Sequence, residues 1–132
     1  MRTIKFRGKN GKKWVFGNLE CFPEVETYLI NGRDVNVDTI GQYTGFNDAK
    51  GQPIYEGDIL KTAFSDKPWG IVRWNAGGGY FFIDEQLTFN FWNFNSCVPI
   101  GEILAATVGG RPVVVEVIGN IYDNKELIKE EK

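Results

Sequence analysis

Glycine-containing turns divide this chain into short apolar runs, and no other feature constrains the fold as strongly. Glycine contributes 16 of the 132 residues, and aromatic residues contribute 14% of the chain. An average protein contains only about 7% glycine. Glycine adopts positive φ at little steric cost, and aromatic side chains favour pleated strands. The pattern therefore predicts a mostly-β fold made of short strands and tight turns.

The N-terminal segment is expected to form a β hairpin. Residues 3–7 alternate apolar and charged side chains, which is typical of a half-buried strand. Residues 12–22 are rich in aromatic and aliphatic side chains and form the expected partner strand. Between the two runs, Asn10 and Gly11 form the dipeptide most typical of a tight hairpin turn.

Two registers of this hairpin are open, and they place the aromatic side chains on opposite faces. A two-residue loop leaves Trp14 and Phe16 beside Lys5 and Arg7. An odd-length loop moves both rings to the face of Phe6. We favour the odd-length loop, because it adds two aromatic side chains to the core.

The rest of the chain predicts further short strands and one helix. The expected strands cover residues 26–30, 35–40, 59–63, 70–74, 80–83 and 113–118. The last of them is β-branched and is expected at the centre of a sheet. The only expected helix covers residues 124–129. Strands at this spacing predict one domain over residues 1–132, a small barrel or two abutting β subdomains, 1–53 and 54–132.

Composition and charge restrict the compartment and the partners. The net charge of −2 argues against a general nucleic-acid binder, whose domains are usually basic. The apolar runs are shorter than the roughly 18 residues of a membrane-spanning helix, and the first residues lack the apolar block of a signal peptide. We therefore expect a cytoplasmic protein without membrane contact. In a reducing compartment, Cys21 and Cys97 are expected to be free, buried thiols.

An enzyme is not expected from these residues. The chain has no histidine, so the commonest general base and transition-metal ligand is missing. Glu56 and Asp58 flank Gly57, with Asp48 nearby, and paired carboxylates serve acid–base chemistry or bind hard cations. We favour a structural interpretation, in which Asp58 accepts backbone N–H groups in a turn before a strand. No catalytic residue, cofactor or metal site is therefore predicted.

Basic residues cluster near the N-terminus and suggest a nucleic-acid surface. Six of the 15 Lys and Arg fall in the first 13 residues, before any acidic residue. The candidate patch consists of Lys5, Arg7, Lys12, Lys13 and Trp14. Basic strands with aromatic platforms bind single-stranded nucleic acid. The alternative, which we favour, is that the charges coat a solvated face while the rings fill the core.

A segment without charge forms a second candidate surface. Residues 86–101 contain no Asp, Glu, Lys or Arg. The aromatic members of this segment are Phe89, Phe91, Trp92 and Phe94. Monomers seldom expose large apolar patches, so the segment either folds into the core or is covered by another chain. We expect a homo-oligomer or a protein partner that uses these four side chains.

Three parts of the sequence resemble the YopX family. They are IKFR (4–7) with WVFGNL (14–19), IGQYTGF (40–46) with Asp48, Gly51 and IYEGDI (54–59), and EVIGNIYDN (116–124). Their order and spacing match along nearly the whole chain, except from about residue 85 to 112. The resemblance implies a protein encoded in phages, prophages or other mobile elements. It also implies a β-barrel fold similar to SH3-like domains, and it transfers no catalytic residue. Together with the hairpin and the helix expected from the residues, the predicted fold is mostly β, a small SH3-like barrel with an additional N-terminal β hairpin and a short C-terminal helix.

These observations lead to three hypotheses of function. The first is a non-enzymatic accessory protein of a mobile element that acts through protein contacts. The second is a nucleic-acid-binding module that uses the basic hairpin, and the third is an enzyme centred on Glu56 and Asp58. Exposure of Trp14 distinguishes the first two, because a buried ring offers no platform for stacking.

Overall fold

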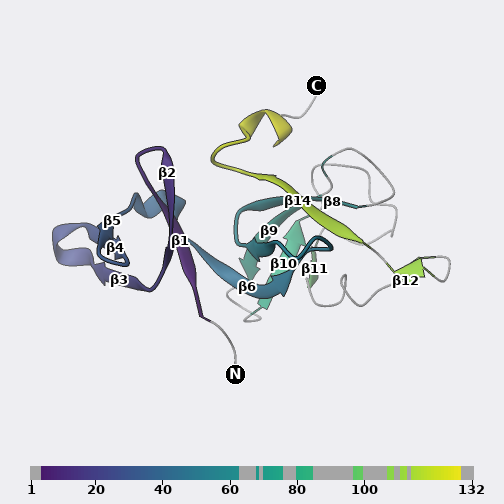
Figure 1. Cartoon of the computed structure of the whole chain (residues 1–132), viewed down its shortest axis with the longest axis horizontal. Coiled ribbons are helices and arrows are strands. Elements are labelled where there is room, and N and C mark those ends of the chain that lie inside the picture. Colours follow the sequence, from purple (N-terminus) through teal and green to yellow (C-terminus); the bar gives the residue numbers. More distant parts are fainter. Residues whose placement is uncertain are drawn as a thin grey trace. The chain divides into compact units, whose positions relative to one another are not determined.

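The computed structural model describes residues 4–62, 68, 70–75, 80–84, 97–99, 107–108, 111–112 and 114–128. The chain divides into two compact units, residues 1–45 and 46–132 (Figure 1). Strand β6 (Gly41–Asn47) contains the boundary, which falls after Gly45. The single-domain description with a subdomain boundary near residue 53 stays a prediction.

The first unit is built around the hairpin of β1 (Phe6–Asn10) and β2 (Lys13–Gly17). Its register pairs Asn10 with Lys13 and leaves a two-residue loop, so the favoured odd-length loop is wrong. Gly11 in this loop has φ of 62°, a conformation that few other residues adopt cheaply. Strand β6 pairs with the other edge of β1, where the Tyr43 N–H donates to the Lys5 carbonyl oxygen at 2.8 Å.

The expected strand 12–22 is broken into two strands that belong to different sheets. After β2, strand β3 (Leu19–Phe22) joins β4 (Thr27–Ile30) and β5 (Arg33–Asp34), with the short 3-10 helix η1 (Pro23–Val25) between β3 and β4. The break lies at Gly17, whose φ is 146°. The Asn31 side chain fixes it, because its amide nitrogen donates to the Phe16 carbonyl at 3.0 Å and its oxygen accepts from the Asn18 N–H at 3.1 Å.

The strand expected over residues 35–40 is wrong as well. Residues Val37–Thr39 form the 3-10 helix η2, because local side-chain hydrogen bonds compete with the extended conformation. The Asn36 side chain accepts from the Asp38 N–H at 2.9 Å. The Thr39 hydroxyl donates to the Asn36 carbonyl at 2.7 Å and accepts from the Lys9 N–H at 2.8 Å, which ties η2 to β1.

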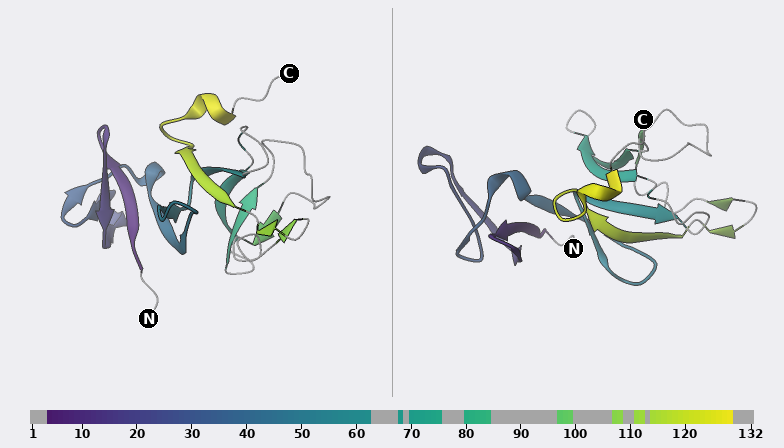
Figure 2. Two further views of the ribbon diagram at one scale, coloured as in Figure 1. Left: turned by 45° about the vertical axis from the view of Figure 1, so that its right-hand side comes forward. Right: turned by 90° about the horizontal axis from the view of Figure 1, so that it is seen from above.

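The second unit contains a five-stranded antiparallel sheet that curls into a half-barrel (Figure 2). Its order is β11 (Cys97–Pro99), β10 (Tyr80–Asp84), β9 (Gly70–Asn75), β8 (Asp58–Thr62) and β14 (Val115–Asn120). Strand β7 (Pro53–Tyr55) follows β6, and β12 (Thr107–Val108) pairs with β13 (Arg111–Pro112). The fully buried side chains of this unit include Ile54, Ile59, Leu60, Val72 and Val115. The predicted mostly-β fold is confirmed.

Strand β14 lies at one edge of this sheet and not at its centre, so that prediction is wrong. The turn after β6 covers the outer edge of β14, which removes the need for a further strand. The Ala49 N–H donates to the Val115 carbonyl at 3.0 Å. Asp48 Oδ2 accepts from the Val117 N–H, also at 3.0 Å.

The C-terminal segment contains a shorter helical element than expected. Residues Lys125–Ile128 form the 3-10 helix η3, and this is the longest helical segment in the described part of the chain. Among the described residues, no helix is long and apolar enough to cross a membrane. Cys21 is a free thiol but is exposed on β3, which corrects the expectation of a buried side chain.

Candidate nucleic-acid interface

One face of the β1–β2 hairpin carries both the cations and the rings. Arg7 lies directly opposite Phe16, and Lys9 lies opposite Trp14. Directly paired residues of an antiparallel ladder point to the same face, and so do residues two apart on one strand. Lys5 precedes Arg7 by two residues and therefore belongs to this face. We call Lys5, Arg7, Lys9, Trp14 and Phe16 the basic-aromatic face.

The cations of this face lie over the rings. The Arg7 guanidinium carbon is 4.6 Å from the centroid of the Trp14 ring, and Lys9 Nζ is 5.5 Å from the same centroid. Lys5 Nζ is 5.9 Å from the centroid of Phe16. All three distances lie within the roughly 6 Å over which a cation is attracted by a ring. The rings therefore hold the positive charges close together along β1.

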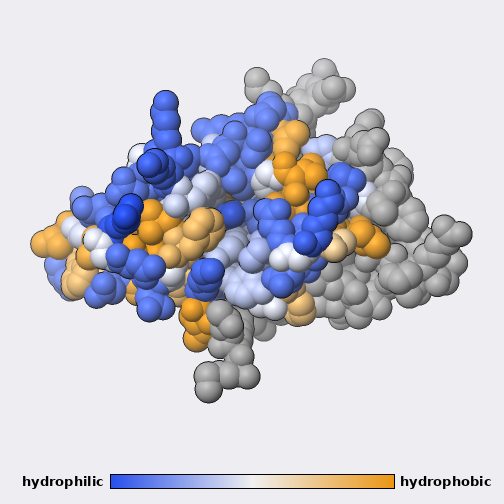
Figure 3. Space-filling view, viewed as in Figure 1, coloured by the Kyte–Doolittle hydropathy of each residue, from blue (hydrophilic) through white to orange (hydrophobic). Residues whose placement is uncertain are grey.

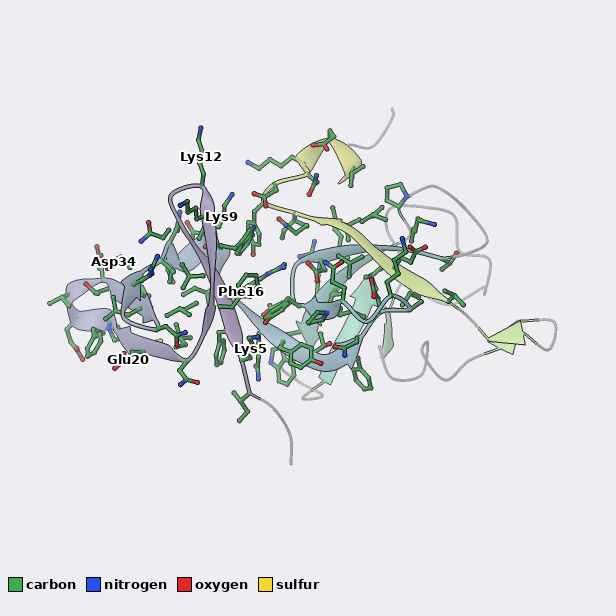
Figure 4. All side chains as sticks on the ribbon, viewed as in Figure 1. Lys5, Lys9, Lys12, Phe16, Glu20 and Asp34 are labelled. Atoms are coloured by element: carbon green, nitrogen blue, oxygen red, sulfur yellow. The ribbon has the colours of Figure 1, made fainter. Side chains whose placement is uncertain are left out.

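The exposure of the rings shows that they are not the core of this unit. The Phe16 side chain is 43% exposed, and Trp14 is half-buried. Arg7 is only 6% exposed. The expectation that both rings fill the core is therefore wrong for Phe16. Figure 4 shows Phe16 on the same side of the hairpin as Lys5 and Lys9.

The core of the first unit lies on the opposite face of β1, at Gly8. A Cβ atom at Gly8 would lie 3.0 Å from the Val35 Cβ and 3.2 Å from the Ile30 Cδ1, so β4 and the residues after β5 pack directly on the backbone there. Ile30 and Val35 are both buried. This close approach fills one face of β1, and it leaves the other face to the cations and rings.

Charge is distributed unevenly between the two units. Residues 1–45 contain seven Lys and Arg and five Asp and Glu, a net charge of +2. Residues 46–132 contain eight and twelve, a net charge of −4. Within the first unit, Glu20 and Asp34 lie on the other side of the hairpin from Lys5 and Lys9 (Figure 4). Lys5 and Lys9 are thus separated from these two carboxylates by the hairpin.

The patch predicted from the sequence corresponds only in part to this face. Lys5, Arg7 and Trp14 lie on this face. Lys12 is in the hairpin loop. Lys13 pairs with Asn10 and points to the opposite face of the hairpin from Trp14. The loop end of the hairpin is hydrophilic (Figure 3). Lys9 and Phe16 also lie on this face but were not part of the predicted patch. The spacing of Lys5, Arg7 and Lys9 at every second position was the signal that identifies the cationic side of β1.

Two of the carboxylates of the central motif, Asp48 and Asp58, accept backbone N–H groups in turns. Asp58 is 2% exposed, and its Oδ2 accepts from the Tyr55 N–H at 2.8 Å. Asp48 Oδ1 accepts from the N–H groups of Lys50 and Gln52 at 2.9 and 2.8 Å. These bonds are the ones that the turn interpretation predicts. Among the described residues, no group of three or more acidic, Cys or His side chains is arranged to hold a metal ion.

An ion-pair cluster lies beside the Asp48 turn. Lys50 Nζ is 3.0 Å and Lys61 Nζ is 3.4 Å from the two carboxylate oxygens of Glu116. The hydrogen bond from Lys50, followed by that from Lys61, lowers the pKa of Glu116 below its usual value. The same hydrogen bond to Glu116 raises the pKa of Lys50. The cluster joins the turn, β8 and β14 at the surface.

The second candidate surface from the sequence is not part of the described structure. Phe89, Phe91, Trp92 and Phe94 lie outside the described residues. Their role as a protein interface stays a prediction.

The sequence of this chain matches a known protein family. The model of the family described as YopX protein matches residues 2–129, which is nearly the whole chain. No curated protein matches the chain by sequence. The matched residues include the basic-aromatic face and the turns at Asp48 and Asp58.

Proposed function

The chain belongs to the YopX family, and from this premise we propose that it is a non-enzymatic accessory protein of phages and other mobile elements. We propose further that its first unit binds single-stranded nucleic acid through the basic-aromatic face. The observation that carries this proposal is the β1–β2 register, which sets Lys5, Arg7 and Lys9 beside two partly exposed rings.

The chemistry of this face suits an unpaired strand. Phosphates are attracted to the row of cations, and a base can stack on an exposed ring such as Phe16. Stacking on an aromatic side chain contributes about 1–3 kcal/mol per base and tolerates any sequence. The first unit has a net charge of only +2, so the binding is expected to be weak and to depend strongly on salt.

Fluorescence anisotropy with a labelled oligothymidylate of about 12 nucleotides tests the proposal. Arg7 is buried, so Lys5 and Lys9 are the cations of this face that can contact phosphates. Two phosphate contacts give a salt slope of about −1.4 for a single strand, so affinity should fall about seven-fold between about 50 and 200 mM salt. The Phe16→Leu substitution should weaken binding by removing the stacking surface, and Lys5→Gln with Lys9→Gln should weaken it and reduce the slope. Lys125→Gln, which changes an exposed cation on η3, is the matched control. Binding that is absent at low salt, or unchanged in the hairpin variants, would contradict the proposal.

A second candidate function is protein binding through the charge-free segment. The observation in its favour is the absence of any charge from residue 86 to 101 around four aromatic side chains. Interface centres are depleted in charged residues and enriched in aromatic ones. The partner is then a second copy of this chain or another protein of the host or mobile element.

Two finer statements on fold and location complete the proposal. We propose that the half-barrel belongs to an SH3-like barrel and that the protein acts in the bacterial cytoplasm. The curled sheet supports the first statement, together with the tight turn that Asp58 forms immediately before β8. An experimental structure of the whole chain tests the fold, and cell fractionation tests the location.

A further inference from the structure

The first unit is strongly polarised along its sequence. Residues 1–18 contain six Lys and Arg and no Asp or Glu, a net charge of +6. Residues 19–45 contain one Arg and five Asp and Glu, a net charge of −4. The first segment includes the β1–β2 hairpin, and the second includes β3, β4, β5, η1 and η2. One copy of the chain therefore carries two segments of opposite charge, and each attracts the other segment of a second copy.

A cavity of this unit lies in the acidic segment. Its volume is about 450 Å³, and it is lined by Glu26, Tyr28, Val35, Asn36 and Val37. Glu26 has the only charged side chain of this lining. Val37 is 48% exposed and Tyr28 is half-buried, so apolar side chains of the wall are open to solvent. The volume is within the roughly 300–1,000 Å³ of ligand pockets, and the lining suits a long side chain with an apolar stem and a positive end.

The backbone at Glu26 has a conformation that favours glycine. Its φ and ψ are 51° and 40°, and the Glu26 N–H donates to the Pro23 carbonyl oxygen at 3.1 Å. A residue with a Cβ atom adopts this left-handed conformation at a cost that glycine avoids. Asn31 also has positive φ, but asparagine adopts it more readily than glutamate does. The fold alone therefore favours glycine at position 26, which points to a role for the carboxylate itself.

The hairpin loop presents a cation beside this cavity. The Asn36 N–H donates to the Lys9 carbonyl oxygen, and the Asn10 side-chain amide donates to the Asp34 carbonyl oxygen, both at 2.9 Å. Because Asn36 lines the cavity, these bonds place it close to the loop end of β1. Lys12, in the two-residue loop, is exposed and extends outward from the hairpin (Figure 4).

We infer that two copies of this chain form a symmetric dimer in which Lys12 of each copy enters the cavity of the other and pairs with Glu26. Within the part of the chain that the structure describes, neither residue forms an ion pair in a single copy. Because the loop and the cavity lie side by side, one two-fold axis satisfies both contacts at once. The lysine stem packs on Tyr28 and Val37 while its ammonium group meets the carboxylate.

This contact is separate from the other proposed surfaces. Lys12 is not part of the basic-aromatic face, so the dimer and the nucleic-acid interface are independent proposals. An association through opposite charges weakens as salt increases, and at physiological salt it is largely screened. An association through the aromatic side chains of residues 86–101 does not weaken in this way. Salt dependence therefore distinguishes the two modes of association.

Sedimentation velocity of charge-reversed variants tests the inference, in protein that also carries Phe91→Ser and Trp92→Ser to remove the aromatic contact. At about 10 mM salt, where charges act over about 30 Å, we expect a dimer whose fraction rises with protein concentration. Lys12→Glu and Glu26→Lys should each weaken dimerisation about ten-fold, because both reciprocal contacts become repulsive. A one-to-one mixture of these two variants should form the dimer again, because each contact then joins opposite charges. Lys125→Glu and Glu126→Lys, at exposed positions on η3, are the matched controls.

The Glu26→Gly variant separates the contact from folding. It should raise the midpoint of urea denaturation, because glycine adopts positive φ readily, and it should nevertheless weaken the dimer. Carbodiimide cross-linking of a mixture of isotope-labelled and unlabelled parent protein is the second measurement, and mass spectrometry should find Lys12 joined to Glu26 between labelled and unlabelled chains. A monomer at every concentration, a variant mixture that stays monomeric, or Lys12–Glu26 links confined to single chains would overturn the inference.

Discussion

Short polar side chains determine the local backbone of this protein. Asp48 and Asp58 each accept backbone N–H groups within their own turns. Asn31 bridges the break between β2 and β3, and Asn120 and Asn124 close the turn after β14. A buried N–H group that loses its acceptor costs about 1–3 kcal/mol. These hydrogen bonds give Asp48 and Asp58 a structural role in their turns.

The Asp58 carboxylate is expected to contribute directly to stability. The Asp58→Ala substitution removes the acceptor of the Tyr55 N–H inside a buried turn, so the free energy of unfolding should fall by about 1–2 kcal/mol. Urea denaturation followed by circular dichroism measures this change. Asp58→Asn retains an oxygen acceptor and should cost less. An alanine variant as stable as the parent protein would contradict the structural role.

The Glu116 cluster is expected to make stability depend on pH at the acidic end. The pKa of Glu116 in the folded protein lies below the ordinary 4.5, because Lys50 donates a hydrogen bond to its carboxylate and Lys61 donates a second one. A carboxylate whose pKa is lowered by folding stabilises the folded protein at pH values above its pKa in the unfolded chain. This contribution is lost as the pH falls through its pKa in the folded protein. Glu116→Gln should therefore lose less stability than the parent protein as the pH falls below 4.5. Thermal unfolding across that range measures the difference, which is expected to be small for a surface cluster. Glu126→Gln should show the same dependence of stability on pH as the parent protein.

At the scale of elements, glycine and asparagine decide where strands end. Gly17 and Gly11 both have positive φ, 146° and 62°. A side chain at Gly17 would also clash with the Asn31 amide, whereas nothing lies within 4 Å of a Cβ at Gly11. Gly11→Ala should therefore lower the free energy of unfolding only by the cost of positive φ for alanine, about 1–2 kcal/mol. Gly17→Ala should cost more and should separate β2 from β3.

Equilibrium unfolding of the two glycine variants provides the comparison. The double variant Gly17→Ala with Asn31→Ala should recover part of the packing cost, because the clashing side chain is gone. Equal losses in the two single variants would show that Asn31 does not fix the break.

The sequence predicted the strand content and most turns, because alternation and turn residues act locally. The hairpin turn and the strands near residues 59–63, 70–74 and 80–83 were all correct. The errors have long-range causes. Asn31 breaks the strand 12–22 from 13 or more residues away, and the Asp48 turn covers β14 across 69 residues. The α-helix expected over 124–129 is replaced by the four-residue η3.

The sequence indicated most residues of the basic-aromatic face, but it did not predict the face of the hairpin on which the rings lie. The hydrophobic pattern favoured a register that collects aromatic rings in the core, because the sequence did not reveal that β4 already fills that face of β1. Gly8 is the residue that makes this packing possible, since Val35 and Ile30 occupy the space of its missing side chain. In the structure, the rings of Trp14 and Phe16 therefore lie on the same face of the hairpin as the cations.

At the scale of the whole molecule, the average charge is a poor guide to the partners. The chain has a net charge of −2, yet its two units have charges of +2 and −4. Acidic charge therefore disfavours nucleic-acid binding by the second unit, but not by the first. Screening over about 8–10 Å at physiological salt makes the local charge the relevant quantity.

The aromatic segment leads to a prediction about assembly of the whole protein. Phe89, Phe91, Trp92 and Phe94 occupy odd and even positions, so a regular strand would place rings on both of its faces. One face can pack on its own unit, and the other is expected to contact a second copy, because each fully exposed ring would forgo about 1.5–3 kcal/mol of burial. We expect a symmetric dimer whose fraction rises with concentration in light scattering. Phe91→Ser with Trp92→Ser should shift the protein to monomer, whereas Phe22→Ser, at an exposed ring on β3, should not. A monomer at every concentration, with all four rings buried in its own core, would contradict this prediction.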